Sequence, residues 1–148
     1  MAPVPIPSPH EILEDLAAEF DMLGDWEERY RHIIDLGRSL PPLTDAERCD
    51  ANKVRGCSSQ VWIVTQTAPD GRLILRGDSD AHIVRGLVAL VLQLYSGQPP
   101  QAILALDPHE AFARLGLSTA LSSQRANGLK SMVERIRHYA QQAMATDP

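Results

Sequence analysis

Cysteine is scarce in this sequence, which contains Cys49 and Cys57 and no other cysteine among its 148 residues. The two lie eight positions apart, which is not the spacing of a C-x-x-C redox pair or of a zinc knuckle. The five histidines are scattered, and none forms an H-x-x-x-H or E-x-x-H pair. A structural zinc site or an iron–sulfur cluster takes about four protein ligands. The sequence therefore predicts no metal site.

Long apolar runs and a secretory signal are also missing. The most apolar run, residues 83–95, contains Arg85 and Gln93 and is shorter than the ~20 residues of a membrane-spanning helix. The first residues have neither the basic start nor the apolar core of a signal peptide. We therefore expect a cytoplasmic protein without membrane contact, whose cysteines are reduced and react as thiolates rather than forming a disulfide.

Positive charge is sparse as well. The formal net charge is −5, residues 1–50 hold twelve acidic side chains against four arginines, and no block of lysine and arginine occurs. This pattern gives no support for nucleic-acid binding. With 44% apolar residues and a length of 148, the chain is expected to fold as a single domain over residues 1–148. Four prolines within the first nine residues indicate that residues 1–8 form an extended arm.

The first part of the chain predicts a helical hairpin. Ser8 followed by a proline and, three positions on, Glu11 is a capping signature, and apolar residues recur behind it at helical spacing until Gly24. Asp25 caps a second helix, which ends before two prolines at residues 41–42.

The middle of the chain changes to strand character. Residues 60–67 are rich in β-branched residues, a Pro-Asp-Gly turn follows at residues 69–71, and residues 72–76 return as the partner strand. Residues 53–55 are expected to add a short third strand. Residues 78–80 offer capping side chains for a buried helix from about Ala81 to Ser96. Two short helices and a last helix from Ser122 or Ser123 complete an α+β fold with a small three-stranded antiparallel sheet.

Cys57 is the first candidate for chemistry. It follows Gly56, whose freedom permits a tight bend, and it precedes polar residues just before the first strand. A loop that is anchored on a sheet is a suitable place to present one reactive atom. Most free cysteines are instead small buried apolar residues, and the residues alone leave both interpretations open. Cys49 lies among charged neighbours and is interpreted as an idle surface thiol.

Other sites have weaker support. A hydrolytic thiol enzyme needs a base, and His82, the nearest histidine in sequence, falls in the first turn of a helix with nothing that aims it at Cys57. Arg125 falls in the first turn of the last helix, where the helix dipole disfavours a cation. It is either simply exposed or placed to stabilise a thiolate at Cys57, a role open to Lys53 and Arg55 as well, and the sequence does not decide between these.

Several separated segments resemble the SufE family, and they occur in the family's order over residues 26–139. They are GCSSQVWI at residues 56–63, WEERY at 26–30, IIDLG at 33–37, GDSDA at 77–81, IVRGL at 83–87 and LSSQRANGL at 121–129. The family usually has glutamine or another polar residue directly after its cysteine, and the small serine at this position, Ser58, is a mild departure from that preference. The resemblance implies the fold of the IscU-like scaffolds. It also leaves, as the alternative function, an iron–sulfur or zinc scaffold of that fold.

The resemblance implies a sulfur acceptor rather than an enzyme. Cys57 would take sulfur as a transient persulfide from a pyridoxal-phosphate (PLP) cysteine desulfurase of the SufS or CsdA type, stimulate that desulfurase, and pass the sulfur to a SufBCD-type scaffold. PLP would belong to the partner, and this chain would bind no cofactor and act as a monomer or weak homodimer. Gly56 would be part of a hinge, and Asp80 would hold the resting loop. Gln60 would bond the loop backbone or simply begin the strand.

Overall fold

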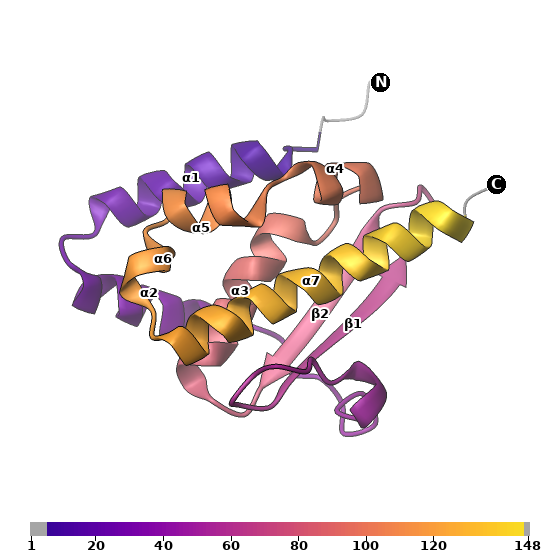
Figure 1. Ribbon diagram of the computed structural model, residues 1–148, viewed down its shortest axis with the longest axis horizontal. Helices are drawn as coiled ribbons and strands as arrows, with labels where there is room; N and C mark the ends of the chain where they lie inside the picture. The colour runs from indigo at the N-terminus through magenta and orange to yellow at the C-terminus, as the bar shows by residue number, and fades with distance from the viewer. Residues whose placement is uncertain (1–5, 147–148) are drawn as a thin grey trace.

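A helical hairpin opens the structure. The computed structural model describes residues 6–146 (Figure 1). Helix α1 (Pro9–Met22) begins at Ser8, whose Oγ accepts a hydrogen bond from the Glu11 amide at 3.2 Å. Helix α2 (Trp26–Arg38) begins at Asp25, whose carboxylate accepts from the Glu28 amide at 2.9 Å. Both predicted helix starts are thus confirmed, because each capping oxygen satisfies an amide that has no partner within the helix.

The sheet has two strands rather than the three that were predicted. Strand β1 (Val61–Thr67) pairs antiparallel with β2 (Leu73–Ser79), and the Pro-Asp-Gly turn joins them as expected. Residues 53–55 contribute a single isolated bridge, between Lys53 and Trp62. The expected third strand fails because a 3₁₀ turn, η1 (Asp50–Asn52), precedes it and the chain bends away at Gly56. The α+β class itself is confirmed.

Strand β2 runs further than predicted and uses the residues expected to cap the next helix. It continues to Ser79, and helix α3 (His82–Tyr95) begins after Ala81 with no side-chain capping bond. The carboxylate of Asp78 instead accepts hydrogen bonds from other segments. The capping prediction failed because Arg48, which is distant in sequence, and Arg85 of α3 both lie against Asp78, an arrangement that local spacing does not reveal.

Helix α3 is the buried centre of the fold, as the apolar residues on nearly every side of it predicted. Ten of its residues are buried, and it packs against α1, α2, β2 and α7. It approaches α2 so closely that a Cβ on Gly86 would lie 2.2 Å from the carbonyl oxygen of Ile33. The two helix backbones therefore touch, and a side chain at position 86 would push them apart.

The C-terminal part forms a cover over this core. Two short helices follow as expected, α4 (Pro100–Ala105) and α5 (Pro108–Arg114), and α6 (Leu117–Ala120) is an additional turn that the sequence did not indicate. Helix α7 (Ser123–Thr146) then crosses in front of the sheet (Figure 1). One face of α7 is apolar and buried at Leu129, Met132, Val133 and Ile136.

The proline-rich arm is described only in its last part. Residues 1–5 of this expected segment lie outside the described residues. The carbonyl oxygen of Pro7 accepts a hydrogen bond of 2.7 Å from Nε2 of Gln98, which ties the start of the described chain to the turn after α3. Within residues 6–146, no helix combines the length and apolar character needed to cross a membrane.

Candidate functional site

Cys57 lies on a short loop between η1 and β1 whose ends are fixed to the sheet. The amide of Val54 donates to the carbonyl of Val61 at 2.8 Å and so closes the base of the loop. Gly56 has a φ of +90°, a conformation that residues with a Cβ rarely adopt. A Cβ at Gly56 would also lie 2.6 Å from the hydroxyl oxygen of Ser131 on α7. Both the bend and the contact with α7 thus depend on glycine at this position.

The Cys57 side chain rests in a small hollow, which we call the seat. Cys57 is half-buried there, and its Sγ donates a long hydrogen bond, 3.6 Å, to the carbonyl oxygen of Gly128. The free volume in the seat is about 10 Å³, close to the least that can hold one water molecule. The seat is lined by Val84 and Leu87 of α3 and by Gln124, Arg125, Gly128 and Met132 of α7, with Ser58 and Ser59 beside Cys57.

Burial raises the pKa of the Cys57 thiol in this position, because a partly apolar seat disfavours the charged form. Arg125 lines the same seat, so the fold does bring it beside the cysteine loop. The sequence left open whether Lys53, Arg55 or Arg125 stabilises a thiolate; in this conformation burial favours the neutral thiol. In the seat, Cys57 is therefore shielded from reagents and is not activated as a thiolate nucleophile.

Asp80 and Gln60 pair at the other end of the loop. The Gln60 amide donates to Oδ1 of Asp80 at 3.0 Å, the Gln60 side-chain Nε2 donates to Oδ2 at 3.4 Å, and the Asp80 amide donates to the Gln60 carbonyl at 3.2 Å. The β1–β2 pairing begins at Val61, so the backbone amide of Gln60 has no partner in the sheet, and the Asp80 carboxylate accepts its hydrogen bond instead. The sequence offered two roles for Gln60, bonding the loop backbone or beginning the strand. Its side chain bonds the Asp80 carboxylate rather than the loop backbone, and Gln60 lies directly before β1.

Replacing Asp80 with alanine should loosen the loop without unfolding the protein. Both bonds to the carboxylate are lost from an exposed side chain, and at about 1 kcal/mol for a hydrogen bond the seated state should weaken about fivefold. The measurement is the alkylation rate of Cys57 by iodoacetamide, with the exposed thiol of Cys49 as the reference in the same molecule. An unchanged ratio of the two rates would show that Asp80 does not hold the loop.

Helix α7 also holds the chain that leads into the loop. Arg135 donates to the carbonyl oxygens of Ala51 and of Lys53, the latter at 3.4 Å, and its Nε donates to the Tyr139 hydroxyl at 2.9 Å. The Tyr139 hydroxyl in turn donates to the Ile63 carbonyl on β1 at 3.0 Å. Sequence reasoning did not single out Tyr139. Spacing along the helix was the available signal, since positions 128, 131 and 135 share one face.

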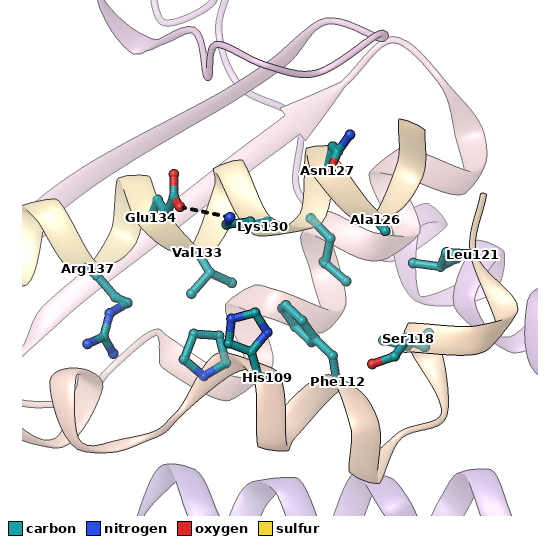
Figure 2. A pocket seen from close by; sticks show the side chains of 13 residues that line it. His109, Phe112, Ser118, Leu121, Ala126, Asn127, Lys130, Val133, Glu134 and Arg137 are labelled. Atoms are coloured by element: carbon teal, nitrogen blue, oxygen red, sulfur yellow. Dashed lines mark ion pairs between the residues drawn. The ribbon is translucent and has the colours of Figure 1, made fainter. Parts of the chain in front are cut away.

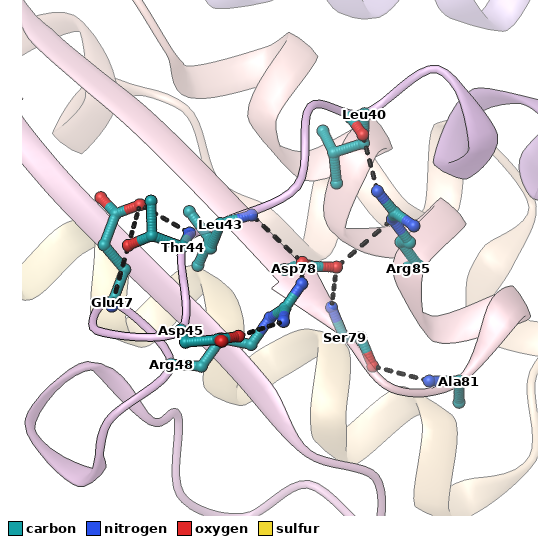
Figure 3. A network of polar contacts seen from close by, with 10 residues as sticks. All are labelled: Leu40, Leu43, Thr44, Asp45, Glu47, Arg48, Asp78, Ser79, Ala81 and Arg85. Atoms are coloured by element: carbon teal, nitrogen blue, oxygen red, sulfur yellow. Dashed lines mark hydrogen bonds and ion pairs between the residues drawn. The ribbon is translucent and has the colours of Figure 1, made fainter.

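A buried carboxylate fixes the strand that leads to Asp80 (Figure 3). Asp78 is 2% exposed. Its oxygens lie 2.9 Å from Nη2 of Arg48 and 3.3 Å from Nε of Arg85, and they accept from the amides of Leu43 at 3.2 Å and Ser79 at 2.9 Å. Burial alone would raise the pKa of Asp78, but these hydrogen bonds and the charge of Arg85 outweigh it and lower the pKa. Sequence reasoning missed this network.

The remaining candidate residues lie apart from the seat. Cys49 is exposed and, like Cys57, is a free thiol. His82 is exposed at the start of α3 and does not line the seat. Across residues 6–146, no group of three or more histidine, cysteine, aspartate or glutamate side chains is placed to hold a metal ion.

A larger hollow, about 460 Å³, lies between α5 and α6 on one side and α7 on the other (Figure 2). His109 and Phe112 project from α5 toward α7, where Lys130 and Glu134 form an exposed ion pair at 4.0 Å. Cys57 does not line this hollow, which uses a different face of α7 from the seat.

Fold and site together define a class of protein: an α+β domain that presents a single loop cysteine against the face of its C-terminal helix. The chain belongs to the SufE family, because the family model described as "SufE: Fe-S metabolism associated domain" matches residues 14–140. Its role therefore lies in iron–sulfur metabolism.

Relatives agree with this assignment. An uncharacterised SufE-like protein of Rhizobium etli is 54% identical over 131 residues, which cover 86% of this chain and 88% of that protein. An uncharacterised SufE-like protein of Rhizobium meliloti is 48% identical over 132 residues, covering 87% and 94%. The solution structure of a hypothetical protein from Thermus thermophilus superposes with a TM-score of 0.76 at 19% identity, over 95% of this chain and 100% of that one. This last likeness concerns the fold alone.

Proposed function

We propose that the protein is a sulfur acceptor that takes a sulfur atom from a PLP-dependent cysteine desulfurase onto Cys57 and passes it on for iron–sulfur cluster assembly. The observation that carries the proposal is the placement of Cys57: one thiol, half-buried, on a loop whose two ends are fixed to the sheet. Such an arrangement presents a single atom in a defined position. It supplies one thiol rather than the several ligands that a cluster scaffold needs.

The transfer step needs no cofactor of this chain. The Cys57 thiolate attacks the outer sulfur of the desulfurase persulfide, a new sulfur–sulfur bond forms on Cys57, and the desulfurase cysteine leaves as a thiolate. The product is a persulfide on Cys57, and no net oxidation occurs. A second attack by an acceptor thiolate, on a scaffold of the SufBCD type, would release the sulfur and regenerate Cys57. PLP and its chemistry remain on the desulfurase.

Transfer requires the loop to leave its seat. The seated thiol is half-buried and burial raises its pKa, whereas attack needs an accessible thiolate. Val54 and the Gln60–Asp80 pair hold the ends of the loop, so the tip moves between them with Gly56 as part of the hinge. Docking of the desulfurase would favour the open position. The two free thiols suit a reducing compartment, and we assign the protein to the cytoplasm on that ground.

The proposal is tested by reconstitution with purified desulfurase and L-cysteine. We expect the protein to raise the rate of sulfide release by the desulfurase in the presence of a reductant, and to show no turnover of L-cysteine by itself. Stoichiometric iron or zinc in the purified protein would instead indicate a scaffold. Hydrolytic turnover without a partner would indicate a thiol enzyme. The choice between desulfurases of the SufS and CsdA types follows from which of the two is stimulated.

A further inference from the structure

The seat fits a bare thiol closely. The Sγ atom of Cys57 lies 3.6 Å from the carbonyl oxygen of Gly128, and a Cβ on Gly128 would lie 3.5 Å from that sulfur. The backbone of α7 therefore already touches the thiol. The apolar side chains of Val84, Leu87 and Met132 close the inner side, all of them buried, and about 10 Å³ remains free.

A persulfide needs more room than this. It places a second sulfur about 2.05 Å beyond Sγ, turned out of line by a dihedral angle near 90°. A sulfur atom is larger than a water molecule's oxygen, and the free volume reaches only the lower limit for one water. The hydrogen bond to Gly128 is also lost, because Sγ no longer carries the proton that it donates. Buried side chains of a packed core do not move aside without cost.

We propose that the seat accepts the thiol of Cys57 but excludes its persulfide, so that loading with sulfur releases the loop tip from α7. This inference rests on the proposed function and deepens it. The loop ends stay fixed through Val54 and Asp80, while the contacts of Gly56 with Ser131 and of Cys57 with Gly128 are broken. Val84 and Gly128 act as positioning residues, since they set the size of the seat without taking part in sulfur transfer.

The position of the loop therefore depends on whether Cys57 carries sulfur. The unloaded form withdraws its thiol, and the loaded form presents its sulfur to an acceptor. By linkage, a partner that binds the open loop favours loading, and loading favours binding of that partner by the same factor. After delivery the thiol returns to the seat, which favours dissociation of the acceptor.

The test uses a chemical load and requires no desulfurase. Methyl methanethiosulfonate converts Cys57 and Cys49 to methylthio disulfides, with methanesulfinate as the leaving group, and each carries the sulfur–sulfur bond of a persulfide. Two rates are measured by mass spectrometry, always relative to exposed Cys49: alkylation of the thiol by iodoacetamide and reduction of the disulfide by dithiothreitol. We expect Cys57 to be alkylated about tenfold more slowly than Cys49, which corresponds to about 1.4 kcal/mol in favour of the seat. Loaded Cys57 should be reduced within about threefold of Cys49, which corresponds to less than about 1 kcal/mol.

A variant with an enlarged seat sharpens the test. In V84A the seat gains the space of two methyl groups, so loaded Cys57 should be retained and its reduction should slow severalfold, while the thiol stays protected. The matched control is V133A, which removes the same atoms from a buried position of α7 that does not line the seat. It should behave as the parent protein.

Two results would overturn the inference. One concerns the parent protein: reduction of loaded Cys57 would be slowed, relative to Cys49, by as large a factor as alkylation of the Cys57 thiol is slowed. The other is V84A reduced no more slowly than V133A. Neither result touches the proposed function, which fails separately if the desulfurase transfers no sulfur to the chain.

Discussion

Substitution of Cys57 by serine should abolish the stimulation of the desulfurase and the delivery of sulfur to a cluster scaffold. Serine is close to cysteine in size and shape, but its hydroxyl does not attack a sulfur–sulfur bond under conditions in which a thiolate does. The stability of the fold should change by no more than about 0.5 kcal/mol, because one half-buried atom is exchanged. The measurement is the rate of sulfide release by the desulfurase with each protein added in excess.

The control for this experiment is the same substitution at the second cysteine. Cys49 is exposed and lies outside the seat, so Cys49→Ser should stimulate the desulfurase as the parent protein does. Loss of stimulation in Cys49→Ser, with Cys57→Ser still active, would show that Cys49 rather than Cys57 is the acceptor thiol.

Substitution of Asp78 by alanine should give the largest loss of stability. Removing one member of a buried ion pair leaves its partners without compensation and costs about 3–5 kcal/mol. We expect the lower end, about 3 kcal/mol, because Arg48 and Arg85 are partly exposed and keep some contact with water. Urea unfolding of both proteins at neutral pH measures the difference. The matched control is Asp45→Ala, which removes the exposed partner of Arg48 at 3.4 Å and should cost less than about 1 kcal/mol.

The stability difference between the parent protein and Asp78→Ala should depend on pH. The pKa of Asp78 is lower in the folded than in the unfolded chain, so the carboxylate stabilises the fold above its unfolded pKa. This contribution is lost as the pH falls through the lowered, folded pKa. The stability difference between the parent protein and Asp78→Ala should therefore shrink on acidification. A difference that stays constant down to the acid unfolding of the parent would contradict the charged role of Asp78.

The helices were predictable because their signals are local. Ser8 and Asp25 lie directly before the helices they cap, and the apolar surroundings of α3 follow from its own sequence. The third strand and the capping role of residues 78–80 failed for different reasons. The strand is cut short by features beside it, the 3₁₀ turn before it and the bend at Gly56 after it. The capping role failed because Arg48, far away in the sequence, and Arg85 on the next helix contact Asp78.

Some residues of the candidate site could be predicted from the sequence and others could not. Gly56 and Cys57 stand out in the sequence because a glycine before a polar loop cysteine is a local pattern. The seat does not, because Val84, Leu87 and Met132 look like ordinary core residues until two helices bring them to the same sulfur. The charge state of Cys57 was also out of reach. The sequence left open whether nearby cations favour a thiolate, whereas burial by those helices favours the neutral thiol.

The most direct test of the central claim is the intact mass of the protein after incubation with desulfurase and L-cysteine, without reductant. The account predicts a gain of one sulfur atom, mapped by peptide analysis to Cys57, present in Cys49→Ser and absent from Cys57→Ser. A protein that stimulates the desulfurase but gains no sulfur at Cys57 would contradict it, since Cys57 would then act by some means other than carrying the atom.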